Sequence, residues 1–360
     1  MPCPSKLRFV QVSDVGLDRS FEHLGGGEVL GEALRKETVA AFARMVGFCT
    51  AAPHDLLLLT GSLVDAELST RSTRLFLDEQ FLRLGEAGLE VVLVPDGELD
   101  LLRERPFVHV LGPGAPELVL ERCCATLVRW SGDSTPNPPR NEGFRFLLGK
   151  LPGADPDEAS LAGLHAQAEA VRPDYLAFWG SPAKLEVPLQ GDRVARCPGS
   201  LCQSVFDDPS THGFFSGVLA GSGLVLTHHL GGGLGLHRRE LTLEPTMNGE
   251  ELASALDRVF EDLPLPAALQ VRLTGTRSFR LDPRLTGRTR PSGLYWVDVS
   301  DCSRYCLPSD RRSRFLLDHY THAFEVELSR ASGDEVEELE RARELGLGLL
   351  LEAAEDEEHR

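Results

Sequence analysis

The chain has 360 residues, a formal net charge of -18, 42% hydrophobic residues and 26% charged residues. These values are ordinary for a globular protein of about two domains. The negative charge argues against tight DNA binding by the isolated chain, because phosphate contacts need a basic surface. No apolar run approaches the ~20 residues that span a bilayer, and the amino terminus lacks a signal-peptide pattern. We therefore expect a cytoplasmic protein that does not contact membranes.

The eight cysteines are too sparse for a disulfide scaffold in a chain of this length, so we expect reduced thiols. Two pairs, Cys197 with Cys202 and Cys302 with Cys306, are close enough in sequence to suggest zinc. Neither pair has the short C-x2-C spacing that is typical of such sites.

The first hundred residues alternate strands and helices. We expect strands at Leu7–Val12, Leu56–Thr60 and Leu89–Val94, with helices at Glu32–Thr50 and Thr70–Gly85 between them. This order with short turns is typical of a parallel sheet with right-handed crossovers. The turn after a buried central strand is where open α/β sheets place their chemistry, and here it carries Ser62 and Asp65.

The middle of the chain predicts further strands around one helix. Short strands are expected at 107–110, 118–120, 125–130, 144–148 and 175–179, with a helix at 157–171. Four later segments look like antiparallel strands that would form a second sheet: 194–196, 213–219, 223–228 and 237–243.

A domain boundary is expected near Pro245. After it, residues 246–330 predict a small α/β capping module with a helix at 248–262 and strands at 269–275 and 294–299. Residues 331–360 predict an acidic C-terminal helix, with helical spacing from 334 to 358. Gly346 and Gly348 within it each cost roughly 1 kcal/mol of helix stability.

Several motifs together resemble one enzyme family. Phe9–Asp18 (FVQVSDVGLD) resembles an opening strand with a D-x-H turn, Leu58–Glu67 (LLTGSLVDAE) resembles G-D-L-F-D, and Val91–Pro95 leads into the place of G-N-H-D. Asp174–Gly180 resembles the strand before G-H-x-H, and Cys197–Ser200 the Y-P-G-S segment that follows. This order is similar to the calcineurin-like metallophosphoesterases, and within them to the SbcD/YhaO-type DNA-repair exonucleases. The resemblance implies a four-layer α/β/β/α sandwich with a capping module.

The resemblance also implies where metal ligands would lie. The family uses two metal ions about 3.5–4 Å apart to clamp a phosphate and activate a water. The first aspartate of the family is kept as Asp14. The other family positions fall on Gly16, Ser62, Gly97, Glu98, Gly149, Ser181 and Ala183. A shift of one residue would put Asp96 in the asparagine place. Glycine and alanine have no side-chain donor atom, so we expect no dinuclear centre, no cofactor and no catalytic residue.

Two functional hypotheses follow from this pattern. The first is a non-catalytic relative, a pseudoenzyme, that acts as a structural or partner-binding component. The resemblance implies an SbcC-type coiled-coil ATPase or a second copy of the chain as its partner, with DNA bound weakly or only within a complex. The alternative is an active nuclease or phosphodiesterase that binds Mn²⁺ through Asp14, Asp65, Asp96 and further ligands.

Each candidate residue also has a structural interpretation. Asp14 and Asp65 are compatible with turn caps, and Asp96 and Glu98 with ordinary turn residues. His228 and His229 follow a strand, and Asp318, His319 and His322 have helical spacing. Both groups are more simply explained as structural or solvated residues than as zinc ligands. The glycine runs 25–27 and 231–233 lack the phosphate-binding spacing of known loops, and no credible Ser-His-Asp order is found.

Overall fold

The computed structural model divides the chain into two compact units, residues 1–236 and 237–360. It describes residues 3–64, 68–96, 105–130, 143–151, 158–189, 193–206, 208, 210–279, 281, 292–305, 311–332 and 334–358. Within these ranges, no helix combines the length and the apolar character needed to cross a membrane.

The first unit contains a six-stranded sheet in the order β12-β11-β1-β2-β3-β4. Strands β1 to β4 run parallel, and β11 pairs antiparallel with both β1 and β12. Its strands are β1 (Lys6–Ser13), β2 (Leu56–Thr60), β3 (Glu90–Val94), β4 (Val108–Val110), β11 (Gly213–Ala220) and β12 (Gly223–Leu230). Every residue of β2 and β3 is buried, as expected for central strands covered on both faces.

A second six-stranded sheet has the order β5-β6-β7-β8-β10-β9. Its strands are β5 (Glu117–Leu120), β6 (Ala125–Arg129), β7 (Phe144–Lys150), β8 (Tyr175–Trp179), β9 (Leu185–Pro188) and β10 (Val194–Cys197). The prediction that segments 213–219 and 223–228 belong to a second sheet is wrong. They extend the first sheet instead, because β11 pairs with β1 from Lys6 to Val12 and covers backbone groups that would otherwise form an open edge.

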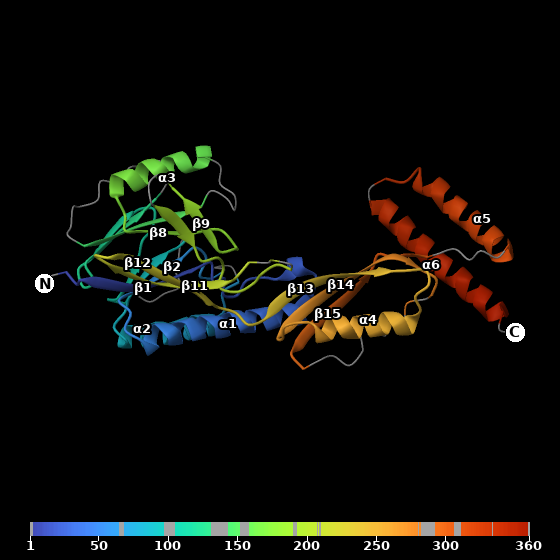
Figure 1. Cartoon of the computed structure of the whole chain (residues 1–360), viewed down its shortest axis with the longest axis horizontal. Helices are drawn as coiled ribbons and strands as arrows, with labels where there is room; N and C mark the ends of the chain where they lie inside the picture. Colours follow the sequence, from blue (N-terminus) through green and yellow to red (C-terminus); the bar gives the residue numbers. More distant parts are fainter. Residues whose placement is uncertain are drawn as a thin grey trace. The chain divides into compact units, whose positions relative to one another are not determined.

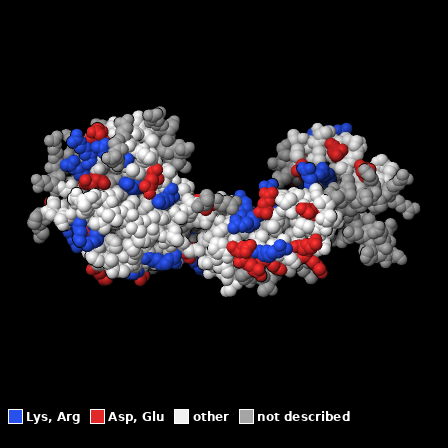
Figure 2. Space-filling view, in the orientation of Figure 1, with Lys and Arg blue, Asp and Glu red and all other residues white. Residues whose placement is uncertain are grey.

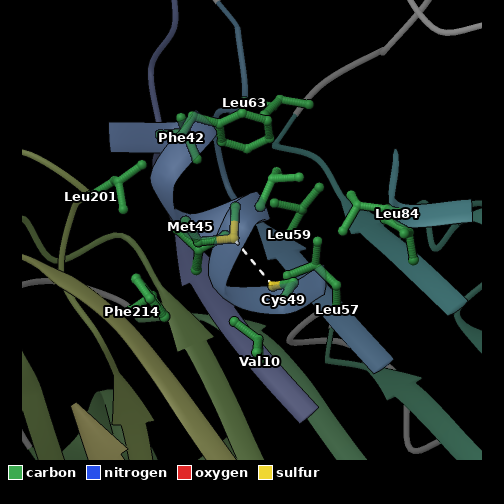
Figure 3. Packing of buried hydrophobic residues seen from close by; sticks show 14 of the residues in the cluster. Val10, Phe42, Met45, Cys49, Leu57, Leu59, Leu63, Leu84, Leu201 and Phe214 are labelled. Carbon is green, nitrogen blue, oxygen red and sulfur yellow. Dashed lines mark hydrogen bonds between the residues drawn. The ribbon is translucent and has the colours of Figure 1, made fainter. Parts of the chain in front are cut away.

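The two sheets are the inner layers of an α/β/β/α sandwich. Figure 1 shows α1 (Gly27–Ala51) and α2 (Arg71–Glu86) on one outer side and α3 (Glu158–Val171) on the other. α1 follows a short 3-10 turn (Glu22–Leu24) and starts five residues before its predicted beginning. Phe42, Met45 and Cys49 of α1 pack on β1 and β2 (Figure 3). The predicted fold class is therefore confirmed.

A separate core joins the sheets to each other. It includes Phe9 of β1, Leu58 of β2, Phe146 of β7 and Tyr175 of β8, all fully buried. The Phe9 ring meets the Phe146 ring edge-on, with centroids 5.4 Å apart. Polar contacts also join the two sheets. In one of them the Tyr175 hydroxyl donates a hydrogen bond of 2.7 Å to Gln11 Oε1.

The second unit is built on a small sheet with one helix packed against it. Strands β13 (Gly235–Leu243), β14 (Ala267–Arg277) and β15 (Leu294–Asp301) lie side by side, and β16 (Arg304–Tyr305) pairs with β14. α4 (Gly249–Glu261) buries Leu252, Leu256 and Phe260 against the sheet. Its first turn has a capping box between Asn248 and Glu251.

Two further helices form a hairpin in the second unit. These are α5 (Arg311–Leu328) and α6 (Asp334–Glu358) (Figure 1). The Tyr320 hydroxyl donates to the carbonyl oxygen of Ala342 at 3.1 Å and lies over Gly346, where a Cβ would collide with it. Gly346 therefore has a packing role that offsets its low helix propensity.

Candidate functional site

Strand ends from both sheets meet at one edge of the first unit. The backbone N–H of Asp14, just after β1, donates to the Thr60 carbonyl at the end of β2 at 2.9 Å. Gly61 N–H in turn donates to the Val94 carbonyl at the end of β3, also at 2.9 Å. The ends of β7 and β8 approach from the other sheet, so this edge gathers turns that are far apart in sequence.

Asp14 lies at the centre of these turns. Its Oδ1 accepts the backbone N–H of Ser62 at 3.2 Å, and its Oδ2 accepts that of Gly180 at 2.9 Å. Burial raises the pKa of this carboxyl, the nearby Asp96 raises it further, and the two N–H groups act in the opposite direction. Asp14 thus links the ends of β1, β2 and β8, and both of its oxygens already accept hydrogen bonds.

Two glycines leave room around Asp14. Gly61 has φ of +76°, and a Cβ there would collide with Asp14 Oδ1. Gly16 has φ of +63°, and a Cβ there would meet Nε of Arg19 at 2.8 Å and Cζ at 2.9 Å. A side chain at position 16 would therefore start in the space that the Arg19 guanidinium fills.

Asp96 is held by donors from the second sheet. Trp179 Nε1 donates to its Oδ1 at 2.6 Å, and Lys150 Nζ donates to its Oδ2 at 2.8 Å. Arg129 lies beside this pair, with its guanidinium carbon 5.8 Å from the centre of the Trp179 ring. Burial lowers the pKa of Arg129, and the negative charge of Asp96 opposes part of this lowering.

The Lys150 side chain points toward Asp96, whereas position 149 faces the opposite side of the sheet. Alternate residues of β7, Phe146 and Leu148, face the first sheet, and Lys150 continues this side. A Cβ on Gly149 would instead meet Cε1 of Phe178 at 2.7 Å and Cε3 of Trp130 at 2.9 Å, on the opposite face. The alternation of the strand could have shown this from the sequence.

The remaining predicted positions contribute few side-chain contacts around Asp14 and Asp96. Ser62 donates its backbone N–H to Asp14, while its hydroxyl points to the Val64 carbonyl at 3.5 Å. Ser181 is buried, and its carbonyl accepts the Cys197 thiol at 3.7 Å. Ala183 is half-buried and offers no side-chain donor. Asp65, Gly97 and Glu98 lie outside the described residues.

The described residues do not fit a pair of divalent ions. Hard cations need several oxygen or imidazole ligands with compensating charge. At this edge the Asp14 carboxylate accepts two backbone N–H groups, and the Asp96 carboxylate accepts the Trp179 indole and the Lys150 ammonium. The Arg19 guanidinium fills the space beside Gly16. Across the described part of the chain, no group of three or more His, Cys, Asp or Glu side chains is arranged to hold a metal ion.

A buried network that the sequence did not indicate lies beside these turns. The Ser200 hydroxyl lies 3.1 Å from His212 Nδ1, and His212 Nε2 lies 3.3 Å from Asp208 Oδ2. Ser210 also contacts both Asp208 and His212. Ser200 is only 3% exposed, and its hydroxyl is 2.9 Å from the Cys202 carbonyl. This Ser-His-Asp group is therefore a structural connection and not an accessible nucleophile.

The paired histidines of β12 are also structural. His229 stacks on Phe214 with centroids 5.1 Å apart and lies 2.8 Å from the Ser216 hydroxyl. His228 Nε2 lies 3.2 Å from the Pro198 carbonyl. Burial lowers the pKa of His212, His228 and His229.

Comparisons with known proteins give a similarity of fold alone. No protein-family model matches it, and no curated protein matches it. Among solved structures, the crystal structure of TT1561 of Thermus thermophilus is similar to it over 62% of this chain and 98% of that chain. The two share 13% sequence identity with a TM-score of 0.36, which is a distant similarity of fold.

Replacing Asp14 tests its structural role. In Asp14→Ala the N–H groups of Ser62 and Gly180 lose their charged acceptor, so we expect the free energy of unfolding in EDTA to fall by about 2 kcal/mol. Denaturant titration measures this change, and Glu32→Ala on the exposed face of α1 is the matched control. Unchanged stability in EDTA, with a loss that develops only when Mn²⁺ is added, would identify Asp14 as a metal ligand instead.

The buried His212 predicts loss of stability in acid. Its pKa in the folded protein is lowered by burial, so the unfolded chain binds a proton near pH 6.5 before the folded chain does. The free energy of unfolding should therefore fall as the pH is lowered from about 7 to about 5. His212→Asn should make this fall shallower, whereas His322→Asn on the exposed face of α5 should not. Equal pH slopes for wild type and His212→Asn would contradict the assignment.

Proposed function

We propose that this chain is a non-catalytic relative of the calcineurin-like metallophosphoesterases, of the SbcD/YhaO type, and that it acts in the cytoplasm as a structural or partner-binding component. The four-layer sandwich and the meeting of turns at Asp14 support this relationship. The absence of side-chain donors at Gly16 and Ala183 supports the loss of the metal centre.

The position of Asp14 is the main support for this proposal. Asp14, the one family ligand kept in the sequence, uses both carboxylate oxygens to accept backbone N–H groups from the two sheets. A carboxylate that joins two turns in this way stabilises the fold whether or not an ion is bound. The retained aspartate is thus explained by structure without any catalytic step.

An active enzyme with an unusual metal site is the second candidate. Its support is the proximity of two carboxylates, because the charge of Asp96 raises the pKa of Asp14. Under this alternative, Mn²⁺ would bind through Asp14 and Asp96 together with Asp65, and would displace Lys150 from Asp96.

Metal content and nuclease activity separate these two functions. The full chain is incubated with excess Mn²⁺, desalted and analysed by mass spectrometry, and its activity on linear duplex DNA is measured in parallel. For a non-catalytic chain we expect almost no retained metal and no cleavage above that of Asp14→Ala. Stoichiometric metal together with cleavage that Asp14→Ala abolishes would establish the active alternative.

The helical hairpin of the second unit is the proposed docking element. Four large apolar side chains are strongly exposed on it: Phe315 and Leu316 of α5, and Leu345 and Leu349 of α6. Exposed apolar residues on neighbouring helices are typical of helix-docking surfaces. We propose a coiled-coil ATPase of the SbcC type as the partner, with a second copy of this chain as the alternative.

DNA is expected to bind weakly, or only within such a complex. Figure 2 shows basic and acidic side chains interspersed on the visible face of the first unit, without a continuous basic field. In the second unit, α4 carries Glu250, Glu251, Asp257 and Glu261 against a single basic residue, Arg258. Together with the net charge of -18, this distribution opposes tight binding to phosphates.

Co-expression tests the docking element. The chain is purified together with a coiled-coil ATPase encoded in the same genome, and we expect a complex that elutes as one species. Phe315→Asp with Leu349→Asp should remove the complex because charges would enter an apolar interface, while the same changes at exposed Leu75 and Leu82 of α2 should leave it intact. A complex insensitive to the hairpin variant would refute this surface. Self-association that is lost in the hairpin variant would favour the second copy.

A further inference from the structure

The Arg19 guanidinium has an unusual position at the meeting of the strand ends. It lies over the backbone of Gly16, with three of its atoms 2.8 to 2.9 Å from the point where a Cβ would be. It is close enough to Asp14 that its charge lowers the pKa of that carboxyl, although burial dominates and the pKa is raised overall. The side chain is half-buried, and among the described residues its guanidinium makes no hydrogen bond or ion pair. Toward the residues that the structure describes, its N–H groups therefore have unused donor capacity.

Lys150 and Arg129 bring further positive charge to the same edge. The Lys150 ammonium uses one hydrogen for Asp96 and is 58% exposed, so it can donate further hydrogens to a ligand. Arg129 is more deeply placed and donates to the Leu111 carbonyl at 2.9 Å. Within the described residues, this cluster has three cationic side chains and two carboxylates, Asp14 and Asp96.

The cluster suits a ligand that accepts hydrogen bonds. The two oxygens of Asp14 accept from Ser62 and Gly180, and the two oxygens of Asp96 accept from Trp179 and Lys150. Among the described residues, the donors of Arg19 and Lys150 have more unused capacity than the four carboxylate oxygens, each of which can accept one further hydrogen bond. Charged N–H donors of this kind bind oxyanions best, and a planar guanidinium matches two phosphate oxygens at once.

We infer that this edge binds a phosphate group without metal ions, with Arg19 and Lys150 as the ligand-contacting cations. The Arg19 guanidinium occupies the space that a metal-ligating side chain at position 16 would enter. The Lys150 ammonium neutralises the charge of Asp96. The site would then bind phosphate through built-in cations where the resembled enzymes use bound metal. This inference goes beyond the proposed scaffold function and does not depend on the hairpin.

The test uses the full chain in EDTA with two probes. Inorganic phosphate and a dinucleotide with one internal phosphodiester are titrated separately, and binding is followed by isothermal calorimetry and by ³¹P line broadening. Arg19→Gln and Lys150→Gln should each weaken binding by about tenfold, which is the effect of losing one charged hydrogen bond. Lys36→Gln, an exposed residue of α1, is the matched control and should bind as the wild type does. Thermal unfolding of each variant verifies that the fold is retained.

The outcomes separate clearly. Binding of inorganic phosphate alone would show that the site takes a free phosphate or a terminal phosphate group. Binding of both probes would show that the site also takes phosphodiesters. No binding at millimolar phosphate, unchanged binding in the Arg19→Gln/Lys150→Gln double variant, or binding that requires Mn²⁺ would overturn the inference. The first two results would leave the scaffold proposal intact, because that proposal is tested by metal content and by complex formation.

Discussion

The first unit depends on the way in which the Asp14 carboxylate joins its two sheets. Ser62 N–H comes from the turn after β2, and Gly180 N–H comes from the turn after β8, so one side chain binds turns of both sheets. The cost of burying the charge is visible in the raised pKa of Asp14. Gly61 is required because its missing Cβ leaves room for Oδ1 of Asp14.

Further polar contacts between β1 and β8 align the two sheets. Gln11 Nε2 donates to the Phe178 carbonyl at 2.9 Å, and Gln11 Oε1 accepts from Tyr175 at 2.7 Å. The Ser13 hydroxyl lies 2.9 Å from that of Thr60 and 3.3 Å from the Phe178 carbonyl. Apolar packing alone would allow the sheets to slide, whereas these directional contacts specify one alignment of β1 against β8. The geometry of the turns around Asp14 follows from that alignment.

The sequence predicted the parts of the fold that depend on local pattern. The wholly apolar run Leu56–Thr60 indicated a doubly covered strand, and the helical spacing from 334 to 358 indicated α6. The sheet to which β11 belongs could not be predicted in this way, because alternation shows which residues are buried and not which neighbour pairs with the strand. The positions of Arg19 and of the Ser200–His212–Asp208 group depend on long-range folding and have no local signal.

Two carboxylates at one partly buried edge create an electrostatic problem that the chain addresses with its own side chains. Without nearby cations, the repulsion between the Asp14 and Asp96 carboxylates would favour protonation of one of them. Here the Asp96 charge meets the Lys150 ammonium and the Trp179 indole, while the Arg19 guanidinium lies beside Asp14. Lys150 and Arg19 thus explain how both carboxylates can lie at this edge together. Because the cations arise from the chain itself, the positive charge at these strand ends is independent of metal supply.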